Sequence, residues 1–482
     1  MKNLSKKLTR IFLLALPPAL FFSYYPVISL AETSTMNLEF SIAEIWLILF
    51  FIVSLPQLLD FAKFYGAKKL LLVATIPTYF FLTILWSANQ LRALLTAGIF
   101  TLIVYAALYI IYILKRHSSL LRPVAGSLII SAVVVSIFCW AQCIMDLAGV
   151  SREYTMLCRG CVSSTFGFPH PNGFAIEPQF MGNLLIAPVL LCFYLVSAKN
   201  NRKIIPVALF LTATLFLTFS RGAIYAVIAG FVIEQILIKI RLNQTRSKAS
   251  RPKSGILKSA AIIIVGLFIS LCAQGIFATL SPTSDNFISG VTKSIHQLTL
   301  GKLDLRPESV KEAESQKAQG TQAAQDPQGQ ATQAEDSSSF SGYVAESTDT
   351  RLGLNGLAFK TWLSSPKYIA AGTGLGSAGI AMHEFAPEEI GPKEIVQNQY
   401  VSLLLETGSI GLILIAVTIL LFIKSTKLVR APGPLFISVL LSFLLTLLFF
   451  SGLPNAIHIY LFLAIVFMFD LSKNYAIIEQ EV

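Results

Sequence analysis

The sequence predicts an all-α polytopic membrane protein of about twelve transmembrane helices, with one large outer loop between the ninth and tenth helices. Of its 482 residues, 54% are hydrophobic and only 13% are charged, which is about half the charged fraction of a soluble domain. Apolar runs long enough to cross a hydrocarbon core of about 30 Å recur along the chain. The cations between these runs fall in alternate loops, which indicates a fixed orientation in a membrane.

The first apolar run has two interpretations. It follows Lys6, Lys7 and Arg10, so residues 1–31 could be a cleavable signal peptide. The run is longer than the apolar region of an ordinary signal peptide, which favours a retained helix. The twelve predicted spans are residues 11–30, 41–59, 70–87, 91–114, 124–146, 173–197, 203–220, 222–240, 256–279, 396–423, 433–452 and 455–472.

The placement of lysine and arginine predicts that the N-terminus lies in the cytoplasm. With that orientation most of the 37 Lys and Arg residues fall in cytoplasmic loops, as the positive-inside rule requires. The net charge of +11 therefore reflects topology and anionic lipid at the cytoplasmic face. Membrane lipid is an expected partner, and nucleic acid is not.

The chain divides into helices 1–9 (residues 1–280), an extracytoplasmic loop (residues 281–395) and helices 10–12 (residues 396–482). The middle of the loop, about residues 307–339, is rich in Gln, Ala, Ser and Glu and has no aromatic residue, which is typical of a flexible insertion. Apolar residues recur at helical spacing on either side of it, around residues 287–295 and 354–363. These stretches either lie on the membrane surface or pack against a small core of the loop itself.

Several arginines stand at the outer face, where cations are normally scarce. Arg92, Arg152, Arg159 and Arg221 fall in short outer loops or at span ends, where they either snorkel to the interface or bind an anionic ligand. Arg221, in LTFSRGAIYAVIAG, marks a break between two spans, and Arg351 opens a helix in DTRLGLNGLAFKTW. Arginine suits a lipid diphosphate because its planar fork pairs with phosphate oxygens and stays charged.

A second set of residues could take or steer a proton. Residues 372–415, where the outer loop re-enters the membrane, supply His383, Gln397, Asn398 and Glu406. The segment GVSREYTMLCRGCVSSTFGFPHPN and the span start after it add the secondary candidates His170, Asn172 and Glu177. Glu406 and Glu177 each need a polar partner at membrane depth, and Arg159 or Arg221 could serve Glu177. Each residue could instead have an ordinary structural role, such as capping a helix or forming a hydrogen bond within a loop.

Metal and nucleotide sites are not expected. Cys158 and Cys161 lack the second CxxC or the His pair of a zinc site. The GTGLG that begins at Gly372 has no βαβ unit around it, so it does not indicate a nucleotide-binding loop. No cofactor is therefore expected.

Three segments together resemble the O-antigen ligase/polymerase family: LTFSRGAIYAVIAG, DTRLGLNGLAFKTWLSSPKYIAAGTGLGSA and VQNQYVSLLLETGSIGLILI. The shared pattern is S-R-G at a span junction, R…W…P…G-G-G late in the outer loop, and the family's H-N…E-x-G-x-x-G, which is Q-N…E-x-G-x-x-G here, where the chain re-enters the membrane. The resemblance is most specific over residues 217–415 without the insertion. Twelve spans with a large loop between the ninth and tenth also match the family architecture.

The resemblance implies a GT-C-like, metal-independent inverting glycosyltransferase of the bacterial plasma (inner) membrane. The donor would be a glycan on undecaprenyl diphosphate, and the acceptor a saccharide, lipid or protein on the outer face. Arg221 and Arg351 match the family arginines that bind the diphosphate, and Arg159 is a further candidate for that role. The family histidine falls on Gln397, which cannot act as a base. His383 or a nearby carboxylate would then take its place, which favours a polysaccharide polymerase or general ligase-like enzyme.

A polytopic transporter, or a flippase of lipid-linked oligosaccharide, is the main alternative. Transporters of this size typically show internal repeats, broken central helices and charges at the bilayer midplane. In this sequence no repeat is visible, and the polar residues cluster at the outer face. The pattern therefore favours an enzyme over a transporter.

Overall fold

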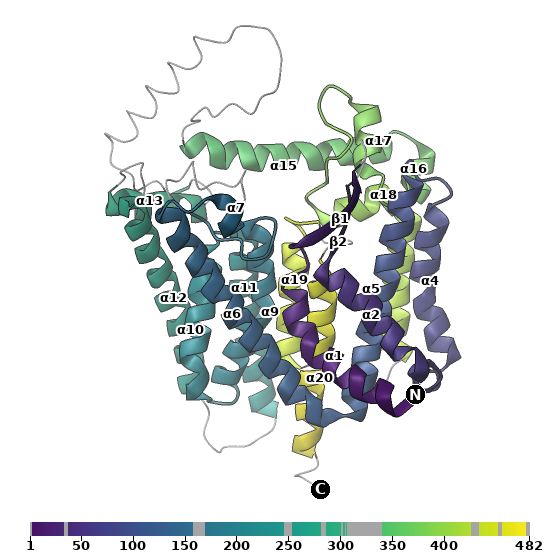
Figure 1. Cartoon of the computed structure of the whole chain (residues 1–482), viewed down its shortest axis with the longest axis horizontal. Coiled ribbons are helices and arrows are strands. Elements are labelled where there is room, and N and C mark those ends of the chain that lie inside the picture. Colours follow the sequence, from purple (N-terminus) through teal and green to yellow (C-terminus); the bar gives the residue numbers. More distant parts are fainter. Residues whose placement is uncertain are drawn as a thin grey trace.

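The structure is a computed structural model that describes residues 2–32, 37–157, 169–244, 253–280, 286–299, 302–303, 305, 340–425, 433–451 and 456–478. Within these residues the chain is mostly helical, and the long helices run side by side between two ends of the molecule (Figure 1). Shorter helices and α15 cover the end opposite the start of α1. The helical prediction is confirmed.

The part of the chain up to residue 280 supplies most of the bundle. Its elements are α1 (Lys2–Leu20), β1 (Val27–Glu32), β2 (Asn37–Ser41), α2 (Ile42–Ser54), α3 (Leu58–Tyr65), α4 (Ala67–Thr83), α5 (Gln90–Arg116), α6 (Leu121–Leu147), α7 (Arg152–Thr155), α9 (Pro178–Ser197), α10 (Ile205–Leu217), α11 (Arg221–Gln244) and α12 (Lys253–Leu280). Short 3-10 turns at Leu55–Gln57, Ser118–Leu120 and Arg202–Ile204 join some of them.

The rest of the chain forms the outer cover and the last helices. These elements are α13 (Phe287–Leu298), α15 (Phe340–Leu363), α16 (Pro366–Ala371), α17 (Ala378–Phe385), α18 (Gln399–Ser425), α19 (Pro434–Thr446) and α20 (Ile457–Ile478). The predicted insertion at residues 307–339 lies outside the described residues.

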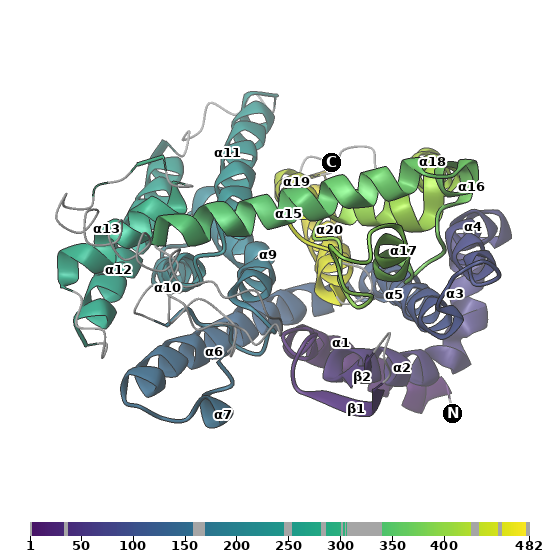
Figure 2. The same ribbon diagram turned by 90° about the horizontal axis from the view of Figure 1, so that it is seen from above.

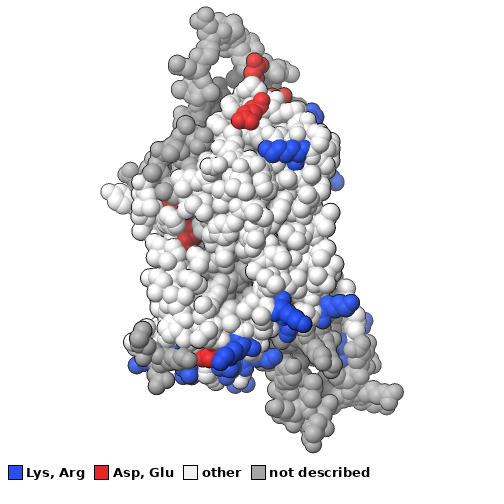
Figure 3. Space-filling model, turned by 90° about the vertical axis from the view of Figure 1, so that its right-hand side faces the viewer, with Lys and Arg blue, Asp and Glu red and all other residues white. Residues whose placement is uncertain are grey.

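A helix stands at each of the twelve predicted spans. Among the described residues, seven helical segments are long and apolar enough to cross a membrane, namely Ile42–Tyr65, Gln90–Arg116, Ser118–Leu147, Pro178–Ser197, Arg221–Arg241, Gly255–Leu280 and Gln399–Ser425. On the face shown in Figure 3, charged side chains lie mainly near the two ends, and the band between them is almost uncharged. A polytopic membrane protein is therefore supported, and the count of twelve spans stays a prediction.

The prediction for residues 11–30 was wrong in its bounds. The first helix begins at Lys2 and ends at Leu20, and residues 27–32 pair with residues 37–41 as an antiparallel hairpin. Residues 21–26 form turns and bends after the helix, and the β-branched Val27 and Ile28 favour a strand. The fold is thus not purely α-helical. The hairpin ends at Ser41, which forms a capping box with Glu44 at the start of α2.

Helix α1 packs as part of the bundle. Leu13, Leu16 and Leu20 are fully buried, and they belong to the main hydrophobic core that also includes residues of α2, α6 and α20. Within a membrane such burial stabilises the bundle through close van der Waals packing between helices, because lipid tails are as apolar as leucine. The first apolar run therefore supports the packing of the other helices.

The stretch around residues 287–295 agrees with a helix on the membrane surface. Helix α13 lies across the outer end of α12 (Figure 1), and Gly290 allows this, since a Cβ there would come within 2.6 Å of the Ala278 Cβ. The buried face of α13 carries Thr292, Ser294 and His296, whereas Phe287 and Ile288 are 42% and 63% exposed. A helix that exposes its apolar side suits contact with lipid.

The stretch around residues 354–363 packs against a small core of the outer loop itself, which is the second of the two predicted alternatives. Helix α15 runs across the outer end from the side of α12 and α13 to the side of α16–α18 (Figure 2). Its Leu357 is buried in a small core with Met382 and Val396 of the following loop, and Leu354 and Trp362 pack against that core. The C-terminal part of the outer loop therefore has its own hydrophobic core, and α15 is fixed to it.

Candidate functional site

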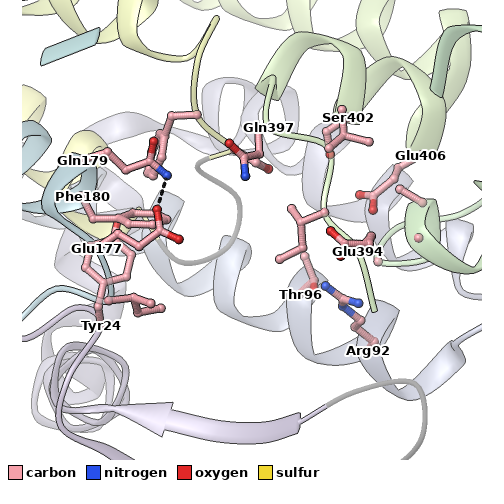
Figure 4. Close-up of a pocket in the computed structure, with 18 residues that line it drawn as sticks. Tyr24, Arg92, Thr96, Glu177, Gln179, Phe180, Glu394, Gln397, Ser402 and Glu406 are labelled. Atoms are coloured by element: carbon pink, nitrogen blue, oxygen red, sulfur yellow. Dashed lines mark hydrogen bonds between the residues drawn. The ribbon is translucent and has the colours of Figure 1, made fainter. Parts of the chain in front are cut away.

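A cavity of about 240 Å³ lies where α5, α9, α17 and α18 meet, near the end of the molecule that carries α15. This volume is below the roughly 300–1,000 Å³ of sites that enclose drug-sized ligands. It therefore admits a small group rather than a long one. The polar residues that line it are Tyr24, Arg92, Thr96, Glu177, Gln179, Glu394, Gln397, Ser402, Glu406 and Ser451, all but the last of which are labelled in Figure 4.

One wall of the cavity is built at the start of α9. Gln179 Nε2 donates a hydrogen bond to Glu177 Oε2 at 2.7 Å, and Gln179 Oε1 accepts one from Arg351 Nη2 at 3.3 Å. Partial burial raises the pKa of the Glu177 carboxyl, and the Arg351 charge and the Gln179 hydrogen bond offset part of that rise. Among the described residues, the cation that acts on Glu177 is Arg351 of the outer loop, whereas the sequence suggested Arg159, which lies outside them, or Arg221.

The opposite wall is formed by α18, α5 and the glycine loop before α17. The backbone N–H groups of Gly376 and Ala378 donate to the Glu406 carboxylate, and the charge of Arg92 acts on it as well. The side-chain carbons of Arg92 pack on Gly376, where a Cβ would come within 2.9 Å of Arg92 Cγ. Glu406 therefore has the polar partners that its position in a span requires, and it fixes the glycine loop to α18.

Helix α18 is broken within this wall. Gly408 has a φ of 64° and a ψ of −175°, a backbone conformation that is almost restricted to glycine. The carbonyl oxygens before the break accept hydrogen bonds from outside the helix: Leu405 from Thr373 N–H (2.8 Å), Glu406 from Gly374 N–H (3.0 Å) and Thr407 from the Tyr79 hydroxyl (2.7 Å). In a membrane such carbonyls need partners, and the GTGLG segment supplies two of them.

Aromatic rings form a third side of the cavity. Tyr24 and Phe180 lie 4.7 Å apart between ring centroids, and Phe180 and Phe450 lie 4.8 Å apart. All three residues line the cavity. They give it an apolar surface beside the carboxylates and amides, so the site can bind a group that has both apolar and polar faces.

Gln397 lines the cavity and Asn398 caps a helix. The Gln397 side-chain oxygen is buried and, among the described residues, has no hydrogen-bond partner. Asn398 Oδ1 accepts hydrogen bonds from the backbone N–H groups of Tyr400 (3.0 Å) and Val401 (3.2 Å) at the start of α18. Of this predicted pair, only Gln397 is free to meet a ligand, because the Asn398 oxygen satisfies the helix terminus.

The prediction that places His383 in the site is not supported by its position. His383 is at the end of α17, outside the cavity lining, and its Nδ1 lies 2.6 Å from the Ile390 carbonyl oxygen. That bond holds the loop after α17 against the helix. Although His383 is close in sequence to the point where the chain re-enters the membrane, its side chain contacts the loop and not the cavity.

Of the three secondary candidates, two have structural contacts and one lines the cavity. His170 is buried and stacks on Phe219 with centroids 4.9 Å apart, and burial lowers its pKa to about 3. Asn172 Nδ2 donates to the carbonyl oxygens of Met156 (3.1 Å) and Ala175 (2.5 Å). His170 and Asn172 therefore hold the outer loop in place, and Glu177 is the only one of the three that lines the cavity.

The two arginines that the resemblance assigns to the diphosphate are Arg351, on α15, and Arg221, at the start of α11, and neither lines the cavity. Arg351 contacts the Gln179 side chain, and Arg221 follows Ser220, whose hydroxyl lies 3.4 Å from the Gln179 carbonyl oxygen. Arg221 begins α11 at the predicted break between spans, although it does not line the cavity. Arg159 lies outside the described residues.

The lining residues that were not assigned to the site from the sequence include Arg92, Gln179, Tyr24 and Glu394. Arg92 is one of the outer-face arginines, and its position at a span start is the sequence signal that points to it. Gln179 follows Glu177 on the same polar helix start. Tyr24 and Glu394 carry no comparable signal, because each lies in a segment whose path only the folded chain determines.

Comparison of the chain with protein families, with curated proteins and with solved structures finds no match. In the part of the chain that the structure describes, no group of three or more His, Cys, Asp or Glu residues is placed to hold a metal ion. Any function must therefore be argued from the cavity and from the sequence segments that form it.

Proposed function

We propose that this protein is a GT-C-like inverting glycosyltransferase of the bacterial plasma membrane. It transfers a glycan from undecaprenyl diphosphate to a saccharide, lipid or protein acceptor at the outer face. The observation that carries the proposal is the hydrogen-bond chain from Arg351 through Gln179 to Glu177, in which Gln179 and Glu177 line one cavity with Gln397 and Arg351 lies outside its lining. The resemblance of its segments to the O-antigen ligase/polymerase family supports the same chemistry.

The reaction needs a cation beside the leaving diphosphate, because negative charge grows there as the glycosidic bond breaks. Arg351 contacts Gln179 from outside the cavity lining, and Arg221 follows Ser220, whose hydroxyl lies 3.4 Å from the Gln179 carbonyl oxygen, so we assign the cation beside the diphosphate to these two arginines. Arginine suits this role since it offers several donors in a fixed plane. Arg92 on the opposite wall is occupied with Glu406 and the glycine loop, so we assign it to holding the cavity in shape.

The cavity composition suits one sugar ring. Tyr24, Phe180 and Phe450 offer flat apolar surface to the C–H face of a ring, and the side chains of Gln397 and Ser402 can hydrogen-bond its hydroxyl groups. The volume of about 240 Å³ leaves the remainder of the glycan outside. Transfer would then involve only the ring at the reacting bond, with the rest of each saccharide in solvent.

Gln397 stands where the family has a histidine. A glutamine cannot accept the proton of the acceptor hydroxyl, but it can orient that hydroxyl through its amide. Its side-chain oxygen is buried and available for this contact. We therefore favour a polysaccharide polymerase or a general ligase-like transferase over a ligase that depends on a histidine base.

Release of undecaprenyl diphosphate tests the proposal. The purified protein is incubated with an undecaprenyl-diphosphate glycan and an acceptor saccharide, and the freed carrier is measured. Arg351→Ala removes a charge-assisted hydrogen bond worth about 1.5–3 kcal/mol, so kcat/KM should fall about 10- to 100-fold. Lys360→Ala is the matched control, because Lys360 is an exposed cation on the same helix and, among the described residues, makes no hydrogen bond to Gln179 or to another residue that lines the cavity. Equal release by both variants and the wild type would remove Arg351 from the mechanism.

The break in α18 favours one other candidate, a transporter or flippase of lipid-linked oligosaccharide. Transporters often place discontinuous helices at their substrate sites. Here the three carbonyl oxygens before Gly408 are occupied by Thr373, Gly374 and Tyr79, so they are not available to coordinate an ion or substrate. The transferase remains the better-supported proposal.

A further inference from the structure

We propose that Glu177 is the general base of the reaction, in place of the histidine that the resemblance leads one to expect. This inference rests on the proposed glycosyltransferase function and assigns the residue that accepts the acceptor proton. Glu177 precedes α9 as its N-cap residue and lines the cavity together with Gln397. Two features support this role: the orientation of the Glu177 carboxylate and the contacts that occupy the other titratable groups at the site.

The Glu177 carboxylate is held with one oxygen fixed and the other directed to the cavity. Oε2 accepts the 2.7 Å hydrogen bond from Gln179, and the other oxygen points toward the open centre of the cavity (Figure 4). Arg351 can only donate hydrogen bonds, so its contact with Gln179 Oε1 places the amide NH₂ group on the side of Glu177. Arg351 therefore fixes the orientation of the base through Gln179.

The other titratable groups at the site are committed elsewhere. Both backbone donors of the glycine loop, Gly376 and Ala378, bond to Glu406, so its oxygens have a structural role. Glu394 is exposed, and a base in open solvent gains little from the enclosed site. His383 bonds to Ile390 outside the cavity. This leaves Glu177 as the partly buried carboxylate with an oxygen free for an acceptor.

The environment of Glu177 also suits a base. Burial raises the pKa of its carboxyl above the ordinary value for glutamic acid, with Arg351 and Gln179 offsetting part of the rise. A base works best when its pKa approaches the working pH. The charged and titratable groups that face it are Arg351 from α15, Tyr24 from the segment before β1, and Arg92, Glu394 and Glu406 from across the cavity.

In the proposed step the acceptor hydroxyl gives its proton to Glu177 while its oxygen bonds to the anomeric carbon of the donor sugar. The bond from that carbon to the diphosphate oxygen breaks, and undecaprenyl diphosphate leaves with the electron pair. The attack comes from the face opposite the leaving group, so the configuration of the anomeric carbon inverts. Glu177 then returns the proton to water. The atoms and charges of this step balance without a metal ion or another reactant.

Substitutions at Glu177 test the role through the pH dependence of carrier release. Loss of a general base typically costs about 10²- to 10⁴-fold, so Glu177→Gln should lower kcat at least about 100-fold with little change in donor KM. The wild-type rate should fall as the pH drops below the raised pKa of Glu177. Glu177→Asp should keep this acid limb at a reduced rate, and Glu177→Gln should lose it. Glu388→Gln, at an exposed carboxylate outside the cavity, is the control.

The variant Gln179→Met tests whether Glu177 acts as a base or has only a structural role. It removes the hydrogen bond that lowers the Glu177 pKa, so the acid limb should move to higher pH, which a merely structural Glu177 would not produce. An active wild type with Glu177→Gln within about threefold of it, or with an unshifted limb in Gln179→Met, overturns the base assignment alone. A wild type that releases no carrier at any pH overturns the transferase itself.

Discussion

Gly408 is the residue on which the shape of the cavity depends most directly, and its replacement by alanine gives a sharp test. At a φ of 64° and ψ of −175° an alanine costs about 1–3 kcal/mol in backbone strain. Its Cβ would also come within 2.4 Å of the Ala370 carbonyl oxygen and 2.5 Å of the Gly372 nitrogen. Both distances are too short to persist, so the segment from Ala370 to Gly374 must move away from α18.

That movement breaks the hydrogen bonds from Thr373 N–H to the Leu405 carbonyl and from Gly374 N–H to the Glu406 carbonyl. Each is worth about 1 kcal/mol. Together with the strain, Gly408→Ala should destabilise the protein by about 3–5 kcal/mol. The glycine loop that bonds the Glu406 carboxylate would be displaced too, so transfer should be lost along with stability.

Thermal unfolding in detergent, followed by tryptophan fluorescence, measures the effect. Gly353→Ala is the matched control, because Gly353 lies in helix α15 with no atom within 4 Å of an added Cβ. An alanine in a helix interior should be neutral or stabilise by about 0.5–1 kcal/mol. If Gly408→Ala unfolds at the same temperature as the wild type and keeps its activity, the break in α18 does not hold the cavity together.

Two further predictions follow from side chains that the structure separates. Gln397→Ala should lower kcat/KM about tenfold, the equivalent of one hydrogen bond, whereas His383→Ala should stay within about threefold; steady-state kinetics with the reverse order would contradict this placement. His170→Phe should keep the stacking on Phe219 and make the fold less sensitive to acid. Because the folded His170 has a pKa of about 3 and the unfolded residue about 6.5, stability falls by up to about 1.4 kcal/mol per pH unit between these values. Melting temperatures at pH 7 and pH 5 should differ less in the variant than in the wild type, and an unchanged difference would refute the assignment.

The positions of the long helices could be predicted because hydrophobic length and charge placement act locally. The helix that begins at Gln90 and the helix that begins at Gln399 follow their apolar runs closely. The first span could not be bounded this way. Residues 11–30 carry no charged side chain, but the helix ends at Leu20, and the strand residues from Val27 onward form a hairpin.

The site was only partly predictable, because proximity in sequence does not determine which side chains face a cavity. Glu177, Gln397 and Glu406 all line it, and each was expected from its polar character near a span end. His383 and Asn398 are neighbours of the re-entry point, yet local hydrogen bonds direct them to a loop carbonyl and a helix terminus. The contact between Arg351 and Gln179 joins positions 172 residues apart, and no local pattern encodes it.

The structure of the product formed in proteoliposomes tests the glycosyltransferase proposal most directly. The undecaprenyl-diphosphate glycan is supplied only at the face that carries α15, together with an acceptor, and the product is analysed by NMR and mass spectrometry. We expect a new glycosidic bond of inverted anomeric configuration, with one undecaprenyl diphosphate released for each bond. Movement of the intact lipid-linked glycan to the other leaflet, with no new bond, would contradict the proposal and identify a transporter.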